Sequence, residues 1–217
     1  MIAVIQRVSE SSVAIAGTIK SAIGQGVMVL IGIENADTHQ NEALAGALAF
    51  KAAIKTLDIL TAKKPNYDKA YFQRGIAYQG LNNYLKSELD YQKSIQLNPK
   101  NPKAYYNFGT LKFLQKDFKA AITQFTKTIE LDSKNAYAYN DRGSCHRMMG
   151  NYPLAIKDYE AASRMNGNLA FVLNNIGSTK TKMKLYADAL TAFNRAISID
   201  AKFYLAYNNR GVTQMKQ

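Results

Sequence analysis

The sequence predicts a mainly α-helical solenoid preceded by a small antiparallel β-meander. Two observations predict the solenoid: glycines recur every 34 residues, and each interval contains two apolar patterns of helical period. A third observation predicts the meander, because the first 33 residues contain short apolar runs separated by glycine. A chain of 217 residues is long enough to bury a substantial core.

The 34-residue period is carried by several positions at once. A large residue, usually tyrosine, stands four positions before each glycine, and an aromatic residue stands sixteen positions after the first four. Glycine inside a helix costs about 1 kcal/mol relative to alanine, so five in register indicate that a neighbouring helix approaches closely. The recurring glycines are Gly75, Gly109, Gly143, Gly177 and Gly211.

This pattern resembles the tetratricopeptide repeat, a helix–turn–helix unit of this length that stacks into a right-handed superhelix. The resemblance implies a half-repeat helix, four units and the first helix of a further unit, over 46–67, 68–101, 102–135, 136–169, 170–203 and 204–217. The last helix has no partner helix in this sequence. Two expectations therefore stay open: that more repeats follow, or that this edge packs on another molecule.

Asparagines gather at the positions just before the repeat glycines, on the first helix of each unit. An asparagine side chain carries both a donor and an acceptor, so a column of them can pair with the amides of an extended peptide. Asparagine ladders of this kind are a known binding mode in the family that the pattern resembles. Ordinary helix-surface polarity is the alternative. The predicted peptide-binding residues in the concave groove are Asn107, Asn140, Asp141, Asn174, Asn175, Asn208 and Asn209.

Arginines and aspartates change together within the repeats. An aspartate follows an arginine by sixteen residues twice, as Arg74 with Asp90 and Arg142 with Asp158. Where the arginine position is apolar, the partner position is uncharged, as in Phe108 with Gln124 and Ile176 with Ala192. This pattern predicts an ion pair between the two helices of a unit, and not a basic binding groove.

The net charge of +12 is unevenly distributed, with −2 over residues 1–50 and +14 over 51–217. A positive field attracts acidic partners, although a solvated surface is the alternative. We therefore expect a protein or peptide partner, with an acidic one favoured by charge, and we do not expect nucleic acid. No stretch of about 20 apolar residues occurs, so the sequence predicts no membrane span and a cytoplasmic protein.

Four strands are predicted in the first part of the chain, over 2–8, 12–16, 18–23 and 27–33, before a helix that begins near Thr38. The stretches MIAVIQRVSESSVAIAG and KSAIGQGVMVLIGIENAD resemble the N-terminus of D-aminoacyl-tRNA deacylases over 1–45. The resemblance implies that Arg7 helps to brace a substrate-binding loop in such an enzyme. Three roles stay open for this truncated segment: a cap on the solenoid, self-association through its sheet edge, or a fusion remnant.

The catalytic segments of that family, Ser-Gln-Phe-Thr-Leu and Asn-x-Gly-Pro-Val-Thr, lie later in its chain. The second is missing from this sequence, and the first has only a near match at 123–126, where Phe125 stands at the aromatic repeat position. We therefore predict a protein-interaction scaffold with an inactive fragment, no catalytic residues and no cofactor. A D-aminoacyl-tRNA deacylase with a repeat extension is the alternative. His39 and His146 are too few for a metal site, and Cys145 is expected to be packed.

Overall fold

The computed structural model describes residues 3–8, 11–15, 18–23, 26–31 and 38–217, with side chains from residue 46 onward. The chain divides into two compact units, Met1–Asp90 and Tyr91–Gln217. Helix α3 (Tyr84–Leu97) contains the boundary between them.

The first unit begins with four strands, β1 (Ala3–Val8), β2 (Ser11–Ile15), β3 (Thr18–Ile23) and β4 (Gly26–Ile31). Strands β1 and β4 pair antiparallel, and so do β2 and β3, with a register shift after Val13. A meander pairs consecutive strands, which β2 and β3 do. The meander as a whole stays a prediction, and the side chain of Arg7 and the turns at 9–10, 16–17 and 24–25 lie outside the described residues.

Helices complete the first unit. Helix α1 (Thr38–Lys63) begins where the sequence predicts a helix start, and it contacts both β4 and α2 (Asp68–Gly80). Helix α3 follows α2, and the Ser87 hydroxyl of α3 donates a hydrogen bond of 2.8 Å to the carbonyl of Gly75 in α2. Residues 46–63, expected to form a half-repeat helix, therefore belong to one long helix that packs on the first helix of the next predicted repeat.

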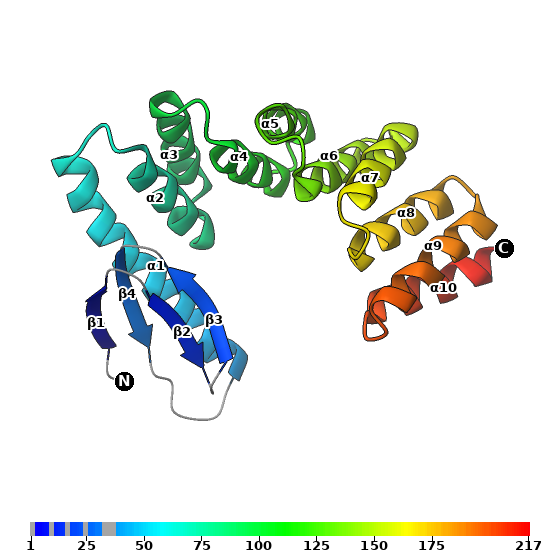
Figure 1. Ribbon diagram of the computed structural model, residues 1–217, viewed down its shortest axis with the longest axis horizontal. Coiled ribbons are helices and arrows are strands. Elements are labelled where there is room, and N and C mark those ends of the chain that lie inside the picture. Colours follow the sequence, from blue (N-terminus) through cyan, green and yellow to red (C-terminus); the bar gives the residue numbers. More distant parts are fainter. Residues whose placement is uncertain (1–2, 9–10, 16–17, 24–25, 32–37) are drawn as a thin grey trace. The chain divides into compact units, whose positions relative to one another are not determined.

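The second unit is a row of antiparallel helix pairs (Figure 1). Its helices are α4 (Pro102–Leu114), α5 (Phe118–Leu131), α6 (Ala136–Met148), α7 (Tyr152–Met165), α8 (Ala170–Lys182), α9 (Tyr186–Ile199) and α10 (Tyr204–Lys216). The first helices α4, α6, α8 and α10 contact one another in order, so they form one layer, called here the first-helix layer. This arrangement confirms a mainly helical solenoid, whereas the superhelical sense and the unit boundaries stay predictions.

Local sequence signals explain where these helices begin and end. The side chains of Asn101, Asp117 and Asn135 each accept a hydrogen bond from a backbone N–H of the helix that follows, which satisfies one of its unpaired donors. The turn inside each helix pair contains one residue with positive φ, and these residues are also 34 apart: Asn82, Lys116, Gly150 and Lys184. Each turn therefore ends its first helix with a left-handed residue.

The repeat glycines hold the two helices of a pair close together. A Cβ atom added to Gly177 would lie 2.6 Å from Cε1 of Phe193, and one added to Gly109 would lie 2.7 Å from Cε1 of Phe125. Both aromatic rings are fully buried. The predicted close approach is confirmed, and the neighbour is the aromatic ring of the second helix.

Candidate protein-binding site

Most of the predicted asparagines bond to one another across adjacent first helices. Asn175 Nδ2 donates to Asn140 Oδ1 at 2.9 Å, and Asn209 Nδ2 donates to Asn174 Oδ1 at the same distance. The two partners are 35 residues apart in both cases. The first-helix layer therefore contains a recurring amide pair, called here the asparagine ladder, that links one repeat to the next.

An acidic variant of the ladder links α4 to α6. The hydroxyl of Tyr106 donates to Asp141 Oδ2 at 2.7 Å, and Asn140 Nδ2 donates to Asp141 Oδ1 at 2.9 Å. Burial raises the pKa of the Asp141 carboxyl, while the bonds from Tyr106 and Asn140 oppose that rise. The pKa of Tyr106 is raised mainly by burial and next by the nearby Asp141 charge. This polar cluster is thus largely satisfied within the protein.

The ladder leaves limited hydrogen-bonding capacity for a ligand. Asn174 is 3% exposed, yet its Nδ2 has no partner among the described residues. Asn208 is exposed and makes no side-chain bond within the described part of the chain, whereas Asn107 Nδ2 bonds to the carbonyl of Lys103 at 2.9 Å. The structure therefore brings together five of the seven predicted residues in inter-helix bonds, and their role in peptide binding stays a prediction.

Two aromatic residues beside the ladder were missed by the sequence analysis. The rings of Tyr137 and Phe171 stack at a centroid distance of 6.0 Å with an interplanar angle of 16°, and Tyr137 is 53% exposed. Each ring lies three residues before Asn140 or Asn174, so it shares that helix face. The signal was available, because an apolar residue recurs there at Leu205, which is also exposed.

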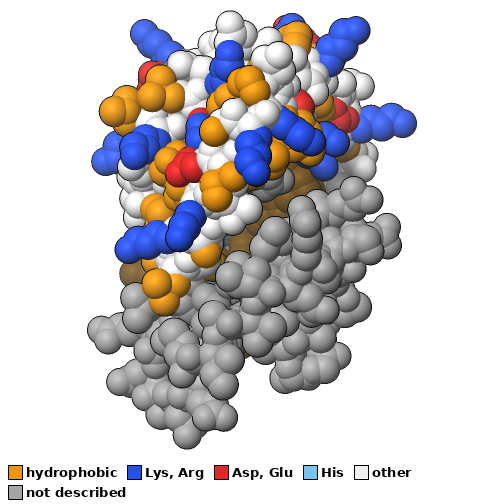
Figure 2. Space-filling model, turned by 90° about the vertical axis from the view of Figure 1, so that its left-hand side faces the viewer, with side chains coloured by type: hydrophobic (Ala, Val, Ile, Leu, Met, Phe, Trp, Pro, Cys, Tyr) orange, Lys and Arg blue, Asp and Glu red, His pale blue; other side chains and the backbone are white. Residues whose placement is uncertain are grey.

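Positive charge concentrates in the first helices of the second unit. Helices α4, α6, α8 and α10 contain eight Lys and Arg residues and one acidic residue, Asp141. Helices α5, α7 and α9 contain five basic and four acidic residues. On the face drawn in Figure 2, by contrast, Lys and Arg side chains stand apart with hydrophobic ones between them. The first-helix layer is therefore the described surface that best suits an anionic partner.

The predicted arginine–aspartate pairs are confirmed, and they are part of a larger arrangement. Arg142 bonds to both carboxylate oxygens of Asp158, at 2.7 and 2.8 Å, and its Nη1 donates to Thr126 at 3.1 Å. Its guanidinium also lies over the ring of Tyr139, 5.5 Å from the centroid. These contacts account for the arginine structurally, as a bridge between two second helices.

The same arrangement recurs with Arg74 and Arg210. Arg74 bonds bidentately to Asp90 and also reaches Asp58, sixteen residues before it, at 2.8 Å. Arg210 donates to Asn194, again sixteen residues before it, at 2.8 Å. Each of the two arginines also lies over a tyrosine ring three residues earlier.

Other chemistry is not supported by the described side chains. Cys145 is fully buried, and burial raises the pKa of its thiol to about 12, so it is packed as predicted. No three His, Cys, Asp or Glu side chains gather as a metal site would need, within the part of the chain that the structure describes. Phe125, in the near match to the deacylase segment, packs against Gly109 in the repeat core. The side chain of His39 lies outside the described residues.

These features define a helical-repeat protein whose repeats are joined through their first helices. Family models of the tetratricopeptide repeat match residues 68–101, 90–123 and 134–202. Residues 68–202 are therefore tetratricopeptide repeats.

Solved structures show the same fold. The crystal structure of MamA superposes with a TM-score of 0.68 at 22% identity, covering 78% of this chain and 98% of that chain. YrrB, described as a TPR protein with an unusual peptide-binding site, gives 0.67 at 20% identity over 78% of this chain and 88% of that one. The first TPR of Spaghetti (RPAP3) bound to the HSP90 peptide SRMEEVD gives 0.51 at 17% identity, over 53% and 91%.

The beginning of the chain matches a different family. The model of D-Tyr-tRNA(Tyr) deacylase matches residues 4–54. D-aminoacyl-tRNA deacylase of Aeromonas hydrophila subsp. hydrophila is 51% identical over 53 residues, which are 24% of this chain and 34% of that enzyme. The enzyme of Phocaeicola vulgatus is 60% identical over 38 residues, 18% of this chain and 25% of the enzyme. The chain thus spans about a third or less of the length of these relatives.

Within the described residues, none of the helices combines the length and the apolar character needed to cross a bilayer.

Proposed function

We propose that the protein is an interaction scaffold that binds an extended, acidic peptide segment along the first-helix layer of its second unit. The observation that carries this proposal is the exposed Tyr137–Phe171 ring pair beside the free amide of Asn174. An aromatic surface next to unpaired donors suits a peptide, because the rings bury apolar area while the amides bind its backbone.

Charge supports an acidic ligand. Eight basic side chains in the first helices face a single acidic one, and that carboxylate is already bonded to Tyr106 and Asn140. The similar Spaghetti repeat is bound to a peptide with three acidic residues in seven. A cytoplasmic location, like the role of the predicted asparagines, stays a prediction.

Peptide selection tests the proposal. Peptides are enriched from a random display library on the full chain, and the best binder is titrated by calorimetry. We expect acidic sequences, with affinity reduced at least about tenfold by Tyr137→Ala, as for a central aromatic contact. Asn208→Ala should weaken binding without loss of helicity, since Asn208 makes no bond in the described structure. Asn140→Ala and Asn174→Ala also break the ladder, so their helicity is measured alongside.

The control lies on the other layer. Leu154 of α7 is 48% exposed, so Leu154→Ala removes a similar apolar surface without touching the first helices. Its affinity should stay within about twofold of the unmodified chain, the range of near-neutral contacts. Unchanged affinity in both Tyr137→Ala and Asn208→Ala would contradict the proposed site.

We further propose that the deacylase-like segment is inactive. Its match ends at residue 54, and the relatives are about three times longer than the matched part. Incubation with charged D-aminoacyl-tRNA should show no hydrolysis above a protein-free blank, and measurable turnover would establish the enzyme instead. Self-association through the strands or through α10 stays a prediction, which light scattering checks.

A further inference from the structure

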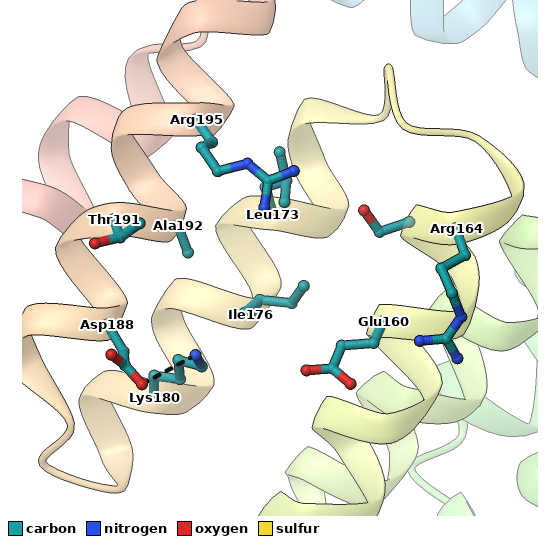
Figure 3. Close-up of a pocket in the computed structure, with 10 residues that line it drawn as sticks. Glu160, Arg164, Leu173, Ile176, Lys180, Asp188, Thr191, Ala192 and Arg195 are labelled. Carbon is teal, nitrogen blue, oxygen red and sulfur yellow. Dashed lines mark hydrogen bonds and ion pairs between the residues drawn. The ribbon is translucent and has the colours of Figure 1, made fainter.

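A groove of about 380 Å³ lies between α7, α8 and α9, away from the asparagine ladder (Figure 3). Its floor consists of Leu173, Ile176 and Ala192, which are at most 8% exposed. Figure 3 shows Glu160 reaching toward Ile176 from α7, and Arg195 reaching over Leu173 at the other end. The groove is therefore apolar below, acidic at one end and basic at the other.

This groove marks the place where the arginine arrangement of the neighbouring repeat is replaced. Leu173, Ile176 and Ala192 stand 34 residues after Tyr139, Arg142 and Asp158. In that repeat the Arg142 guanidinium fills the space over the Tyr139 ring and bonds to Asp158. Smaller apolar side chains leave the equivalent space open, because none of them reaches across it.

One acceptor of the arrangement is nevertheless present. The residue sixteen positions before the arginine accepts its Nη1 bond in three cases, at Asp58, Thr126 and Asn194. The equivalent residue in the groove is Glu160, which is exposed and makes no hydrogen bond or ion pair within the described residues. By contrast, Asp188 on the opposite wall is paired with Lys180 at 3.2 Å. A carboxylate thus faces a space that holds a guanidinium elsewhere in the chain.

We propose that this groove binds one arginine side chain of a partner protein. The methylene stem of that arginine would cover Leu173, Ile176 and Ala192, and its guanidinium would pair with Glu160. Arginine fits better than lysine, because its planar fork can bond a carboxylate through two N–H groups. Arg164 and Arg195 also line the groove, so a second basic residue beside the first is disfavoured and an acidic neighbour is favoured.

Methyl NMR of the full chain tests this site directly. The probe is the peptide acetyl-Ala-Ala-Arg-Ala-Ala-amide, with matched peptides that carry citrulline or glutamate in place of arginine. We expect saturable shifts of the Ile176, Leu173 and Ala192 methyl signals with the arginine peptide. Citrulline, which keeps the shape but removes the charge, should bind about three- to fivefold more weakly, the size of an exposed ion pair.

Two variants separate the groove from unspecific attraction. Glu160→Gln should weaken the arginine peptide by the same factor of about three to five and leave the citrulline peptide unchanged. The double variant Ile176→Arg with Ala192→Asp rebuilds the arrangement of Arg142 and Asp158, fills the groove and should remove the shifts. Circular dichroism confirms that both variants fold. Asn208→Ala and Tyr137→Ala should bind the probe normally, so failure at the first-helix layer and failure here are distinguishable.

Three results would overturn the proposal. The first is equal affinity for the arginine and citrulline peptides. The second is undiminished binding by the filled variant, and the third is tighter binding of the glutamate peptide, which would assign the groove to Arg195. The absence of saturable methyl shifts at millimolar peptide counts against it equally.

Discussion

Arg142 holds both carboxylate oxygens of Asp158, at 2.7 and 2.8 Å, and so joins the two helices of one repeat. Both side chains are largely removed from water, with 20% and 7% of their surface exposed. Desolvation therefore offsets much of the attraction between them, and the net contribution of the pair to stability is small. Loss of one partner has a much larger effect than loss of both.

Substitution of Arg142 alone is expected to be destabilising. Arg142→Ala leaves the buried Asp158 carboxylate without its counter-charge, and the free energy of unfolding should fall by about 3 kcal/mol. The double variant Arg142→Ile with Asp158→Ala copies the residues found at Ile176 and Ala192, and it should lie within about 1 kcal/mol of the unmodified chain. Urea titration followed by circular dichroism measures both. Equal losses in the single and double variants would show that the two residues are not coupled.

Gly177 is expected to tolerate no side chain. Gly177→Ala places a methyl group 2.6 Å from the buried Phe193 ring, so overpacking should lower stability by about 1–3 kcal/mol despite the better helix propensity of alanine. Gly211 stands at the same repeat position, and a Cβ there meets no heavy atom within 4 Å. Gly211→Ala is therefore the matched control, which should be neutral or stabilising by up to about 1 kcal/mol. Thermal unfolding that ranks the two in the opposite order would reject this packing.

The turn at Lys184 is expected to accept glycine with a gain. Lys184 is exposed and has φ of 63°, whereas Gly150 occupies the equivalent turn with φ of 78°. A left-handed conformation costs an L-residue about 1–2 kcal/mol, so Lys184→Gly should stabilise the protein by about 1 kcal/mol. The reciprocal variant Gly150→Lys should destabilise it by a similar amount. Chemical denaturation of both chains provides the check, and effects of the same sign would refute the assignment.

The pH dependence of stability should contain a contribution from His146. Burial lowers the pKa of His146 from its ordinary 6.5, Asp158 raises it and Arg142 lowers it. Its Nδ1 is buried and unpaired among the described atoms, and its Nε2 lies 3.9 Å from Asp158. The unfolded chain therefore takes up the proton first, and stability falls as pH decreases below 6.5 toward the lowered value.

His146→Gln removes this titration and provides the comparison. Denaturation at pH 7.5 and at pH 5.5 should show a smaller loss of stability for the variant than for the unmodified chain. Asp141, whose pKa burial raises, acts in the opposite direction at lower pH, so the comparison stays above its ordinary range. An identical pH dependence in both proteins would exclude His146 as its source.

The sequence was sufficient for features that repeat as pairs of residue types. Arg142 and Asp158 change together with Ile176 and Ala192, so their contact was predictable from one chain. The asparagines were predictable as a cluster but not in their bonds, because an amide pairs equally well with a ligand or with another amide. The bond from Asn175 to Asn140 depends on how two repeats stack, and periodicity alone does not define that geometry.

The ring pair and the groove escaped the sequence analysis for related reasons. Tyr137 and Phe171 flank buried alanines, and aromatic residues in such helices usually belong to the core. The groove arises from three replacements by smaller side chains, and only the structure shows that no other side chain fills the space. The strand segment matched its relatives well by sequence, although its meander arrangement stays a prediction.

The asparagine ladder has a consequence for how the second unit unfolds. Its bonds join positions 35 residues apart, so melting one repeat leaves a buried amide of its neighbour without a partner. That penalty adds to the interface between repeats and raises the cooperativity of the array. Native-state hydrogen exchange should therefore find α6, α8 and α10 opening together, with fraying confined to the outermost turns.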